Sequence, residues 1–433
     1  MKSRVFAAVL LCAMDGAARA QSAAIVEAEQ TSVSDWQAFW NEQSASGAVR
    51  GDYYRSSHSL DNTNGFFGAT AQIKAVPKFG DRVDGKLEAR VTNSDLPGDA
   101  KTHSSLLEAY LALHFERSDL RVGKQIVAWG RADGINPTDN LTPHDYVVLL
   151  PFEEDQRFGT SAVKWDNYLS NELTFTIFAT PFFEPAKIPS LAQGGASVET
   201  RPAHTLADGE VALKLNRTGG DLDWSVSYLR GHNLLPSARL LGADATWPQL
   251  ELHYDRINVL GADVAHNFGR YGFRAEAAYF STQDKNGGDP SVMNPYFYYV
   301  AGFDRTFSES LNLNLQVFGR WVRNFNDPQS IPDALQRELA LQNAITDGQQ
   351  ARVSYGWTAR LGNKWLNDTL EAELLVVANI TQHNAFLRPL ISYAVTDRMK
   401  ATAGGEIYQG ARSSYFGRLK PNQGMFSELK YSF

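Results

Sequence analysis

The sequence predicts an all-β protein, a transmembrane antiparallel β-barrel of about 18 strands with long extracellular loops and short periplasmic turns. Three observations predict this fold. Apolar and polar residues alternate with period two over most of residues 47–433. The segments that connect the alternating stretches are short and long in turn. The final segment, 425–433, is itself an alternating strand, and it ends on an aromatic residue, Phe433.

Residues 1–20 have the pattern of a secretory signal peptide. Two basic residues precede an apolar run at 5–14, and an A-x-A cleavage site ends at Ala20. The apolar run is too short to span a membrane as a mature helix. The alternative to a signal peptide is a buried N-terminal helix. The only cysteine, Cys12, lies in this segment. The mature chain is therefore expected to carry no thiol, disulfide or thiolate metal site.

Residues 21–46 do not alternate and form a separate segment, periplasmic or plugging the pore, that is expected to be partly helical. Trp36, Phe39 and Trp40 recur at helical spacing after Ser34, which can cap a helix. The simpler interpretation is a pre-barrel tail with some helical content.

The composition limits the class of protein. The formal net charge of −7 argues against a nucleic-acid partner. No run of about 18 apolar residues offers a transmembrane helix. A content of 43% hydrophobic and 12% aromatic residues excludes a disordered chain. A secreted chain of this kind is either a large periplasmic domain or a membrane barrel.

The barrel is assigned to residues 47–433 because both faces of its strands are distinctive. In the stretch 107–116, for example, apolar residues alternate with residues such as Glu108 and His114. One face suits lipid and the other suits a wet lumen. Two strands break this pattern, because Lys124 and Asp263 each share a face with apolar residues. Bulges, or strand ends beyond the bilayer, are the expected explanations.

The lengths of the connections favour a barrel over a soluble β-sandwich, which has no reason to alternate them. The short connections are expected at 77–81, 117–118, 167–170, 218–220, 269, 307–310, 363–366 and 396–397. The long ones are expected at 56–64, 93–101, 129–157, 181–206, 231–254, 283–294, 324–349 and 411–421. A helical stripe at 331–345 predicts an external helix within one long loop.

The C-terminal strand is expected to close the barrel by pairing with the first strand, near 48–54. Leu429, Tyr431 and Phe433 fall on one face of it, and Glu428 and Lys430 on the other. This ending resembles the C-terminal signal by which Gram-negative outer-membrane proteins are recognised for insertion. The resemblance implies a place in the cell outer membrane of a Gram-negative bacterium. The implied partners are outer-membrane lipid and, through the strand ending in Phe433, the barrel-assembly machinery.

The hairpin at 120–166 is the most distinctive stretch, with a G-K-Q-x-x-x-W-G strand end, an N-P-x-D loop and an E-D-Q-R-x-G return. It resembles the porin-like outer-membrane family related to alginate-export barrels. The resemblance implies transport across the outer membrane without naming a substrate. It carries over, as structural positions first, to Gly123, Lys124, Gln125, Trp129, Gly130, Pro137 and Asp139.

The loop at 129–157 is expected to fold into the barrel and set the bore of the channel. Its charged residues would then line the substrate path. These residues are Arg131, Asp133, Asp139, Asp145, Glu153, Glu154, Asp155 and Arg157. The alternative is that the same charges only hold the loop against the barrel wall. The two interpretations overlap, because an anchored loop still makes a constriction.

The charges predicted on the lumen face of the strands have both signs. They include Arg90, Glu108, Arg274, Glu276, Arg320, Arg352 and Arg360, together with Arg50. This mixture disfavours an alginate-type polyanion as the permeant. Apolar runs at 146–152 and 182–191 would make the channel entrance hydrophobic, which favours a hydrophobic or aromatic permeant. The alternative is that these loops pack on themselves.

The function predicted from these patterns is a passive outer-membrane channel for a small, partly hydrophobic or aromatic solute. The alternative is the outer-membrane part of a lipid or polysaccharide exporter, with an inner-membrane exporter as partner. A lipid hydrolase is less favoured, because no serine-hydrolase motif lies at a strand end. No catalytic residue, cofactor or metal site is predicted. The acidic stretch 284–289 has calcium-like spacing, but turns need the same residues.

Overall fold

The computed structural model describes residues 44–60, 63–95, 102–147, 152–188, 196–243 and 248–433. The predicted signal peptide and almost all of the segment 21–46 lie outside these residues. The barrel forms one compact unit, Ser46–Phe433. Within the described ranges, no helix is long and apolar enough to cross a bilayer.

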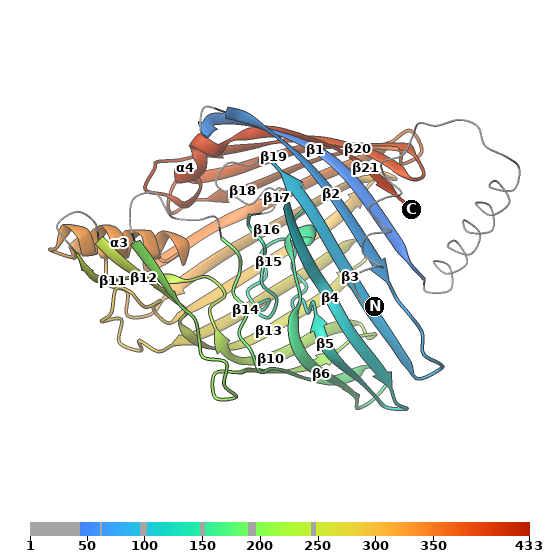
Figure 1. Ribbon diagram of the computed structural model, residues 1–433, viewed down its shortest axis with the longest axis horizontal. Helices are drawn as coiled ribbons and strands as arrows, with labels where there is room; N and C mark the ends of the chain where they lie inside the picture. Colours follow the sequence, from blue (N-terminus) through green and yellow to red (C-terminus); the bar gives the residue numbers. More distant parts are fainter. Residues whose placement is uncertain (1–43, 61–62, 96–101, 148–151, 189–195, 244–247) are drawn as a thin grey trace, which may run out of the picture. The chain divides into compact units, whose positions relative to one another are not determined.

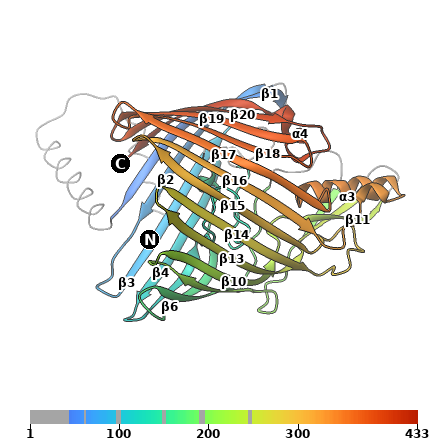
Figure 2. The ribbon, with the colours of Figure 1, turned by 180° about the vertical axis from the view of Figure 1, so that it is seen from behind.

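Eighteen antiparallel strands form one closed sheet, as the sequence predicted (Figures 1 and 2). Each pairs with the next strand of the sheet along the chain. The strands are β1 (Ser46–Leu60), β2 (Thr63–Ala75), β3 (Val83–Ser94), β4 (Thr102–His114), β5 (Ser118–Gln125), β6 (Thr160–Tyr168), β7 (Leu173–Thr180), β9 (Glu210–Arg217), β10 (Leu222–His232), β13 (Arg256–Phe268), β14 (Tyr271–Thr282), β15 (Tyr296–Phe307), β16 (Leu311–Val322), β17 (Val353–Trp365), β18 (Leu370–Asn379), β19 (Asn384–Thr396), β20 (Met399–Gln409) and β21 (Gly424–Ser432).

The first and last strands pair and close the barrel at the predicted place, near residues 48–54. Tyr431 lies opposite Val49, and Glu428 lies opposite Asp52. Beyond the strand end, Gly47 and Phe433 exchange two backbone hydrogen bonds of 2.9 Å. Both edges of β1 are therefore paired, which a strand in lipid requires.

The alternation of residues sorts the side chains between the two faces of the wall. Outward positions carry exposed apolar side chains, such as Phe67 (65% exposed) and Leu260 (60% exposed). Inward positions carry polar or charged side chains that are buried, such as Arg90 and Glu276. This pattern matches a barrel with an apolar outer band and a polar interior.

Eight short turns lie at one end of the barrel, near the predicted positions. The connections at the other end are mostly long, but two of them are short. Residues 61–62 join β1 to β2, and residues 380–383 join β18 to β19. The loop prediction at 56–64 is wrong, because most of these residues lie in β1 and β2. A polar hairpin and a polar loop have the same composition.

The long connections contain most of the remaining secondary structure. The strands β8 (Ala196–Thr200), β11 (Ser237–Ala243) and β12 (Pro248–His253) form a separate sheet. The predicted external helix is α3 (Ala334–Thr346), capped by the Asp333 carboxylate, which accepts a hydrogen bond from the Gln336 backbone N–H. A shorter helix, α4 (Tyr415–Leu419), precedes the last strand.

The explanation by a bulge is wrong for Asp263. The strand β13 pairs with both neighbours without a register shift. Val259 and Asp263 both face inward, and Val259 belongs to a buried apolar cluster inside the barrel. Lys124 is the penultimate residue of β5, at a strand end, and its ammonium lies 2.8 Å from the Glu184 carboxylate.

We expect Leu429→Arg to destabilise the barrel by up to about 2–4 kcal/mol, because it places a charge on the apolar outer band. Urea unfolding in detergent or lipid, followed by heat-modified gel mobility, measures the effect. The matched control is Leu206→Arg, because Leu206 lies in a long loop and is 89% exposed. Equal stability of the two variants would show that Leu429 does not face lipid.

Candidate functional site

The loop between β5 and β6, residues 126–159, is anchored on one side of the barrel by the carboxylate of Glu276 in β14. This carboxylate accepts hydrogen bonds from the backbone N–H groups of Arg131 and Ala132 and from the Thr138 hydroxyl at 3.0 Å. Gly130 has a φ of +98°, and a Cβ there would lie 2.6 Å from a carboxylate oxygen of Glu276. Only glycine fits this close approach without strain.

Arg131 extends from the same anchor along the wall. Its guanidinium binds the Asp263 carboxylate of β13 and donates to the Asn216 side chain of β9 at 2.7 Å. The Asp263 carboxylate also accepts a hydrogen bond from the Ser225 hydroxyl. The Arg131 side chain is thus bound to the barrel wall.

The tip of the loop reaches a third part of the wall through Asp133. Its carboxylate binds the Arg360 guanidinium of β17. Arg360 also lies 3.9 Å from Glu373 of β18. Both Asp133 and Arg360 keep a substantial exposed fraction, 26% and 40%, so this pair faces open space.

The returning part of the loop is held on the other side of the barrel by Arg50 of β1. The Arg50 guanidinium binds the Asp155 carboxylate through two hydrogen bonds, 2.6 and 3.1 Å long. It also lies 3.6 Å from Glu428 of β21. Arg90 of β3 donates to the backbone carbonyl of Asp155. Asp155 lies in a short 3-10 helix, η1 (Glu153–Gln156).

These anchors show that the loop spans the interior. In the strand order, β1 and β13 are nine positions apart whichever way the barrel is traversed. Two strands of an 18-stranded barrel cannot lie farther apart. A loop that binds both strands through their inward side chains must cross the lumen, where it is visible between the walls in Figure 1.

The loop is also held by contacts within itself and with the next loop. Asp139 forms an ion pair of 2.7 Å with Arg157 and accepts a hydrogen bond from the Trp129 backbone N–H at 3.1 Å. Burial raises the pKa of Asp139, although Arg157 opposes that effect. Asp145 binds Lys187 of the next loop at 2.7 Å.

An apolar cluster lies beneath the first half of the loop. Val127, Trp129 and Leu141 pack against inward side chains of the strands from β6 to β16, including Phe178 and Val259. The loop therefore covers one wall of the lumen. The strands β17–β21 and β1–β4 contribute no residue to this buried cluster among the described residues.

Most of the predicted path residues of this loop form ion pairs with the barrel wall, with each other or with the next loop. Arg131, Asp133, Asp139, Asp145, Asp155 and Arg157 all have ion-pair partners. Glu153 and Glu154 lie in η1, and their side chains are outside the described set. The observed contacts agree with the alternative that these charges anchor the loop.

The predicted lumen charges fall into two groups. Arg90, Glu108, Glu276 and Arg360 bind the loop. Glu108 pairs with Lys86 and accepts from the Ile126 backbone N–H, while Arg274 lies 3.3 Å from Asp304. Arg320 lies over the rings of Tyr296 and Tyr298 and donates to the Asp347 backbone carbonyl. Arg352 is exposed and precedes β17.

Several residues of this site, among them Asp263 and Asn216, were not among the sequence-predicted path or lumen residues. Asp263 was noticed only as a break in the alternation, and that break was the signal for it. Asn216 carried no signal, because an inward polar residue is ordinary in such a barrel. The Asp284 carboxylate accepts backbone N–H groups of Gly287 and Asp289 at 3.0 and 2.7 Å, which is turn geometry.

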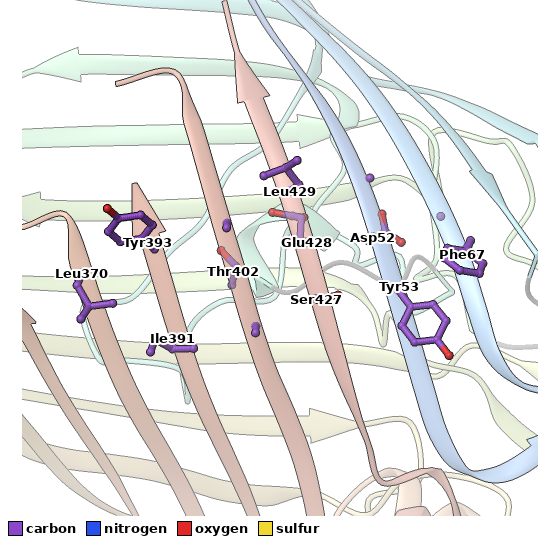
Figure 3. Close-up of a pocket in the computed structure, with 14 residues that line it drawn as sticks. Asp52, Tyr53, Phe67, Leu370, Ile391, Tyr393, Thr402, Ser427, Glu428 and Leu429 are labelled. Carbon is purple, nitrogen blue, oxygen red and sulfur yellow. The ribbon is translucent and has the colours of Figure 1, made fainter. Parts of the chain in front are cut away.

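A cavity of about 560 Å³ lies away from this loop, on the strands around the closure (Figure 3). Small outward residues, Gly51, Ala401 and Ala403, leave space between larger ones such as Tyr53 and Phe67. It is a groove in the apolar outer band, so it is not part of a path through the lumen.

We expect Gly130→Ala to loosen the loop, because the new methyl group would meet Glu276 and the positive φ costs about 1 kcal/mol more. The readouts are hydrogen exchange and limited proteolysis across 129–157. The matched control is Gly134→Ala, since Gly134 also has a positive φ of +79° but no atom within 4 Å of an added Cβ. Equal loosening in both variants would exclude a role for the Glu276 contact.

The loop should also respond to acid through His144. Burial and the nearby Arg157 lower the pKa of His144 to about 4, from an ordinary 6.5. The folded loop therefore favours neutral His144, and this stabilisation is complete above pH 6.5 and lost as the pH falls toward 4. We expect a loss of about 2–3 kcal/mol near pH 4.5.

Hydrogen exchange of the loop at pH 7 and pH 4.5, corrected for the intrinsic exchange rate, measures this loss. The variant His144→Gln should show a smaller pH dependence than the native chain. The control His204→Gln changes an exposed histidine of another loop. An unchanged pH dependence in His144→Gln would refute the assignment.

Comparison with known proteins identifies similar folds among solved structures but no matching sequence family. No protein-family model matches the chain, and no curated protein gives a significant match. The similar solved structures include Acinetobacter baumannii OccAB4, with a TM-score of 0.55 and 12% identity over 90% of this chain and 97% of that one. They also include a BenF-like porin from Pseudomonas fluorescens Pf-5, with a TM-score of 0.54 and 9% identity over 90% and 97%.

Pseudomonas aeruginosa OpdK, solved with vanillate, is similar at a TM-score of 0.51 and 8% identity, over 90% of this chain and 98% of that one. These comparisons give no support to the expected relation to alginate-export barrels. At such low identities the likeness shows the fold alone: the chain is a porin-like, closed 18-stranded β-barrel.

Proposed function

We propose that this chain is a passive outer-membrane channel for a small, partly hydrophobic or aromatic solute, narrowed by the loop at 129–157. The observation that carries the proposal is the attachment of this loop across the interior, from Arg50 on β1 to Asp263 on β13. Barrels of about 16–18 strands leave an aqueous channel unless loops fold inward. A loop held across such a lumen narrows it.

The outer face supports a place in the outer membrane. Its exposed apolar side chains, such as Phe67 and Val317, would be covered by lipid. The closing strand β21 presents Leu429 and Tyr431 outward, and the exposed Phe433 follows it; this pattern resembles the insertion signal. We therefore infer that the chain is assembled through this strand and is surrounded by outer-membrane lipid.

The nature of the solute is inferred from two observations. The charges around the loop have both signs and are mostly paired, which favours no polyanion. One of the similar structures contains vanillate, which has an aromatic ring, and another is of a BenF-like porin. A small solute with an aromatic or other apolar part fits both observations.

Planar-bilayer recording tests the channel and its constriction together. We expect native protein to conduct ions and Arg50→Gln to conduct more, because this change removes the guanidinium that holds Asp155 and leaves nearby carboxylates to repel one another. The control is Arg201→Gln, which alters an exposed ion pair with Glu199 in another loop.

Absence of conductance in folded native protein would overturn the proposed channel. Native conductance in a folded Arg50→Gln variant would leave a channel but exclude narrowing by the attached loop. Gel mobility and urea unfolding establish that each variant is folded before it is recorded.

A further inference from the structure

A set of aromatic side chains lines the inner wall opposite the loop's apolar cluster. Each of five neighbouring strands, from β19 through β20, β21 and β1 to β2, contributes one inward aromatic residue. In strand order these are Phe386, Tyr408, Phe426, Tyr54 and Phe66. Phe416 of α4 packs against two of them. We call these six residues the aromatic arc.

The rings stack within two groups of the arc, one formed by Phe386, Tyr408 and Phe416 and the other by Tyr54 and Phe426. Phe386 and Tyr408 have ring centroids 5.2 Å apart at 23°, and Phe416 lies 5.7 Å from Phe386 at 22°. Tyr54 and Phe426 are 5.7 Å apart at 30°. The Phe426 ring approaches the backbone of Gly404, where a Cβ would lie 2.6 Å from its Cζ. Glycine at that position leaves the ring flat against the wall.

The arc lies on the long-loop side of the Arg50 attachment. Tyr54 is four residues beyond Arg50 along β1, which corresponds to about 13 Å at the usual rise of a strand. A solute that enters from the long-loop end therefore meets the arc before the Arg50–Asp155 contact. The wall opposite is the one that the apolar half of the loop covers.

Two structural roles explain the arc less well. Aromatic girdles at membrane interfaces face lipid, whereas these residues face the lumen. The buried apolar cluster under the loop contains none of the six. Phe66 and Phe426 are buried, whereas Tyr54, Phe386, Tyr408 and Phe416 are partly exposed.

We propose that the aromatic arc is a stacking site for the planar aromatic ring of a permeant, and that it selects ring planarity rather than charge. Its charged neighbours have both signs. The Arg388 guanidinium lies over Phe426 at 5.8 Å, and the Glu406 carboxylate accepts a hydrogen bond from the Tyr408 hydroxyl at 2.8 Å. A flat ring can stack on the partly exposed rings of the arc, whereas a puckered saturated ring makes poorer contact.

This inference rests on the proposed channel function, and block of ion current in planar bilayers tests it separately. Two pairs of probes differ only in ring saturation: benzenesulfonate with cyclohexanesulfonate, and benzylammonium with cyclohexylmethylammonium. The members of each pair have equal charge. We expect the aromatic member of both pairs to block at a concentration lower by about 2- to 10-fold, the range for one stacking contact.

Variants of the arc locate the effect. Phe386→Leu and Tyr408→Leu should each reduce the preference for the aromatic probes toward unity while conductance persists. Phe416→Leu, in α4 rather than in a barrel strand, provides the same test where a strand variant does not fold. The matched controls are Tyr53→Leu and Phe67→Leu, because these aromatic residues adjoin the arc in sequence but face outward (Figure 3).

The outcomes separate the two proposals. Conducting native protein that blocks equally with planar and saturated probes would overturn the stacking site and leave the channel intact. A preference that survives in Phe386→Leu, Tyr408→Leu and Phe416→Leu, or that is lost equally in the outward controls, would also overturn it. A preference confined to the sulfonates would show that charge governs selection, contrary to the proposal. Absence of any current would instead overturn the channel.

Discussion

The need to pair every backbone group of a strand governs the structure. A strand in lipid cannot leave an edge open, so the sheet must close on itself. Closure here joins β1 to β21, which are separated by nearly the whole chain, and it is completed by the two hydrogen bonds between Gly47 and Phe433. The number of strands then sets a lumen too wide for wall side chains to fill. The interior therefore has room for the loop that enters it.

The loop that enters this lumen brings polar backbone and charged side chains into a confined space. Residues of the wall form hydrogen bonds or ion pairs with them. Glu276 receives N–H groups at the first turn, Asp263 receives Arg131, and Arg50 receives Asp155. Buried ion pairs add little net stability, but leaving one partner alone is costly. Such pairs therefore define one position of the loop more than they strengthen the barrel.

The fold was predictable because residues of a barrel strand alternate between a face toward lipid and a face toward the aqueous lumen. This alternation is visible in the sequence as a period of two. The strand count, the closing pair and the helix at α3 followed from local pattern and capping. Two short connections at the long-loop end were missed, since nothing in a polar hairpin distinguishes it from a loop. The apolar Val259 on an inward face misled the assignment of Asp263, because only the covering loop explains an apolar lumen residue.

The partners within the candidate site were less predictable. Residues 131 and 263, or 50 and 155, meet only through the register of many strands, and no local pattern reports that pairing. The charges of the loop were recognised by composition, but whether they face the solute or the wall depends on this geometry. The aromatic arc was hidden for the same reason, because each strand contributes a single ring.

The position of Arg50 links the loop to the order of assembly. Arg50 contacts β21 through Glu428 and the loop through Asp155, so its full set of partners exists only after the first and last strands have met. A register slipped by one residue would turn the Arg50 side chain toward lipid and separate it from both carboxylates. The Arg50 contacts that hold the loop can therefore form only in a correctly closed barrel. In a barrel whose first and last strands are not fully paired, the loop would lack these contacts and would take a different position.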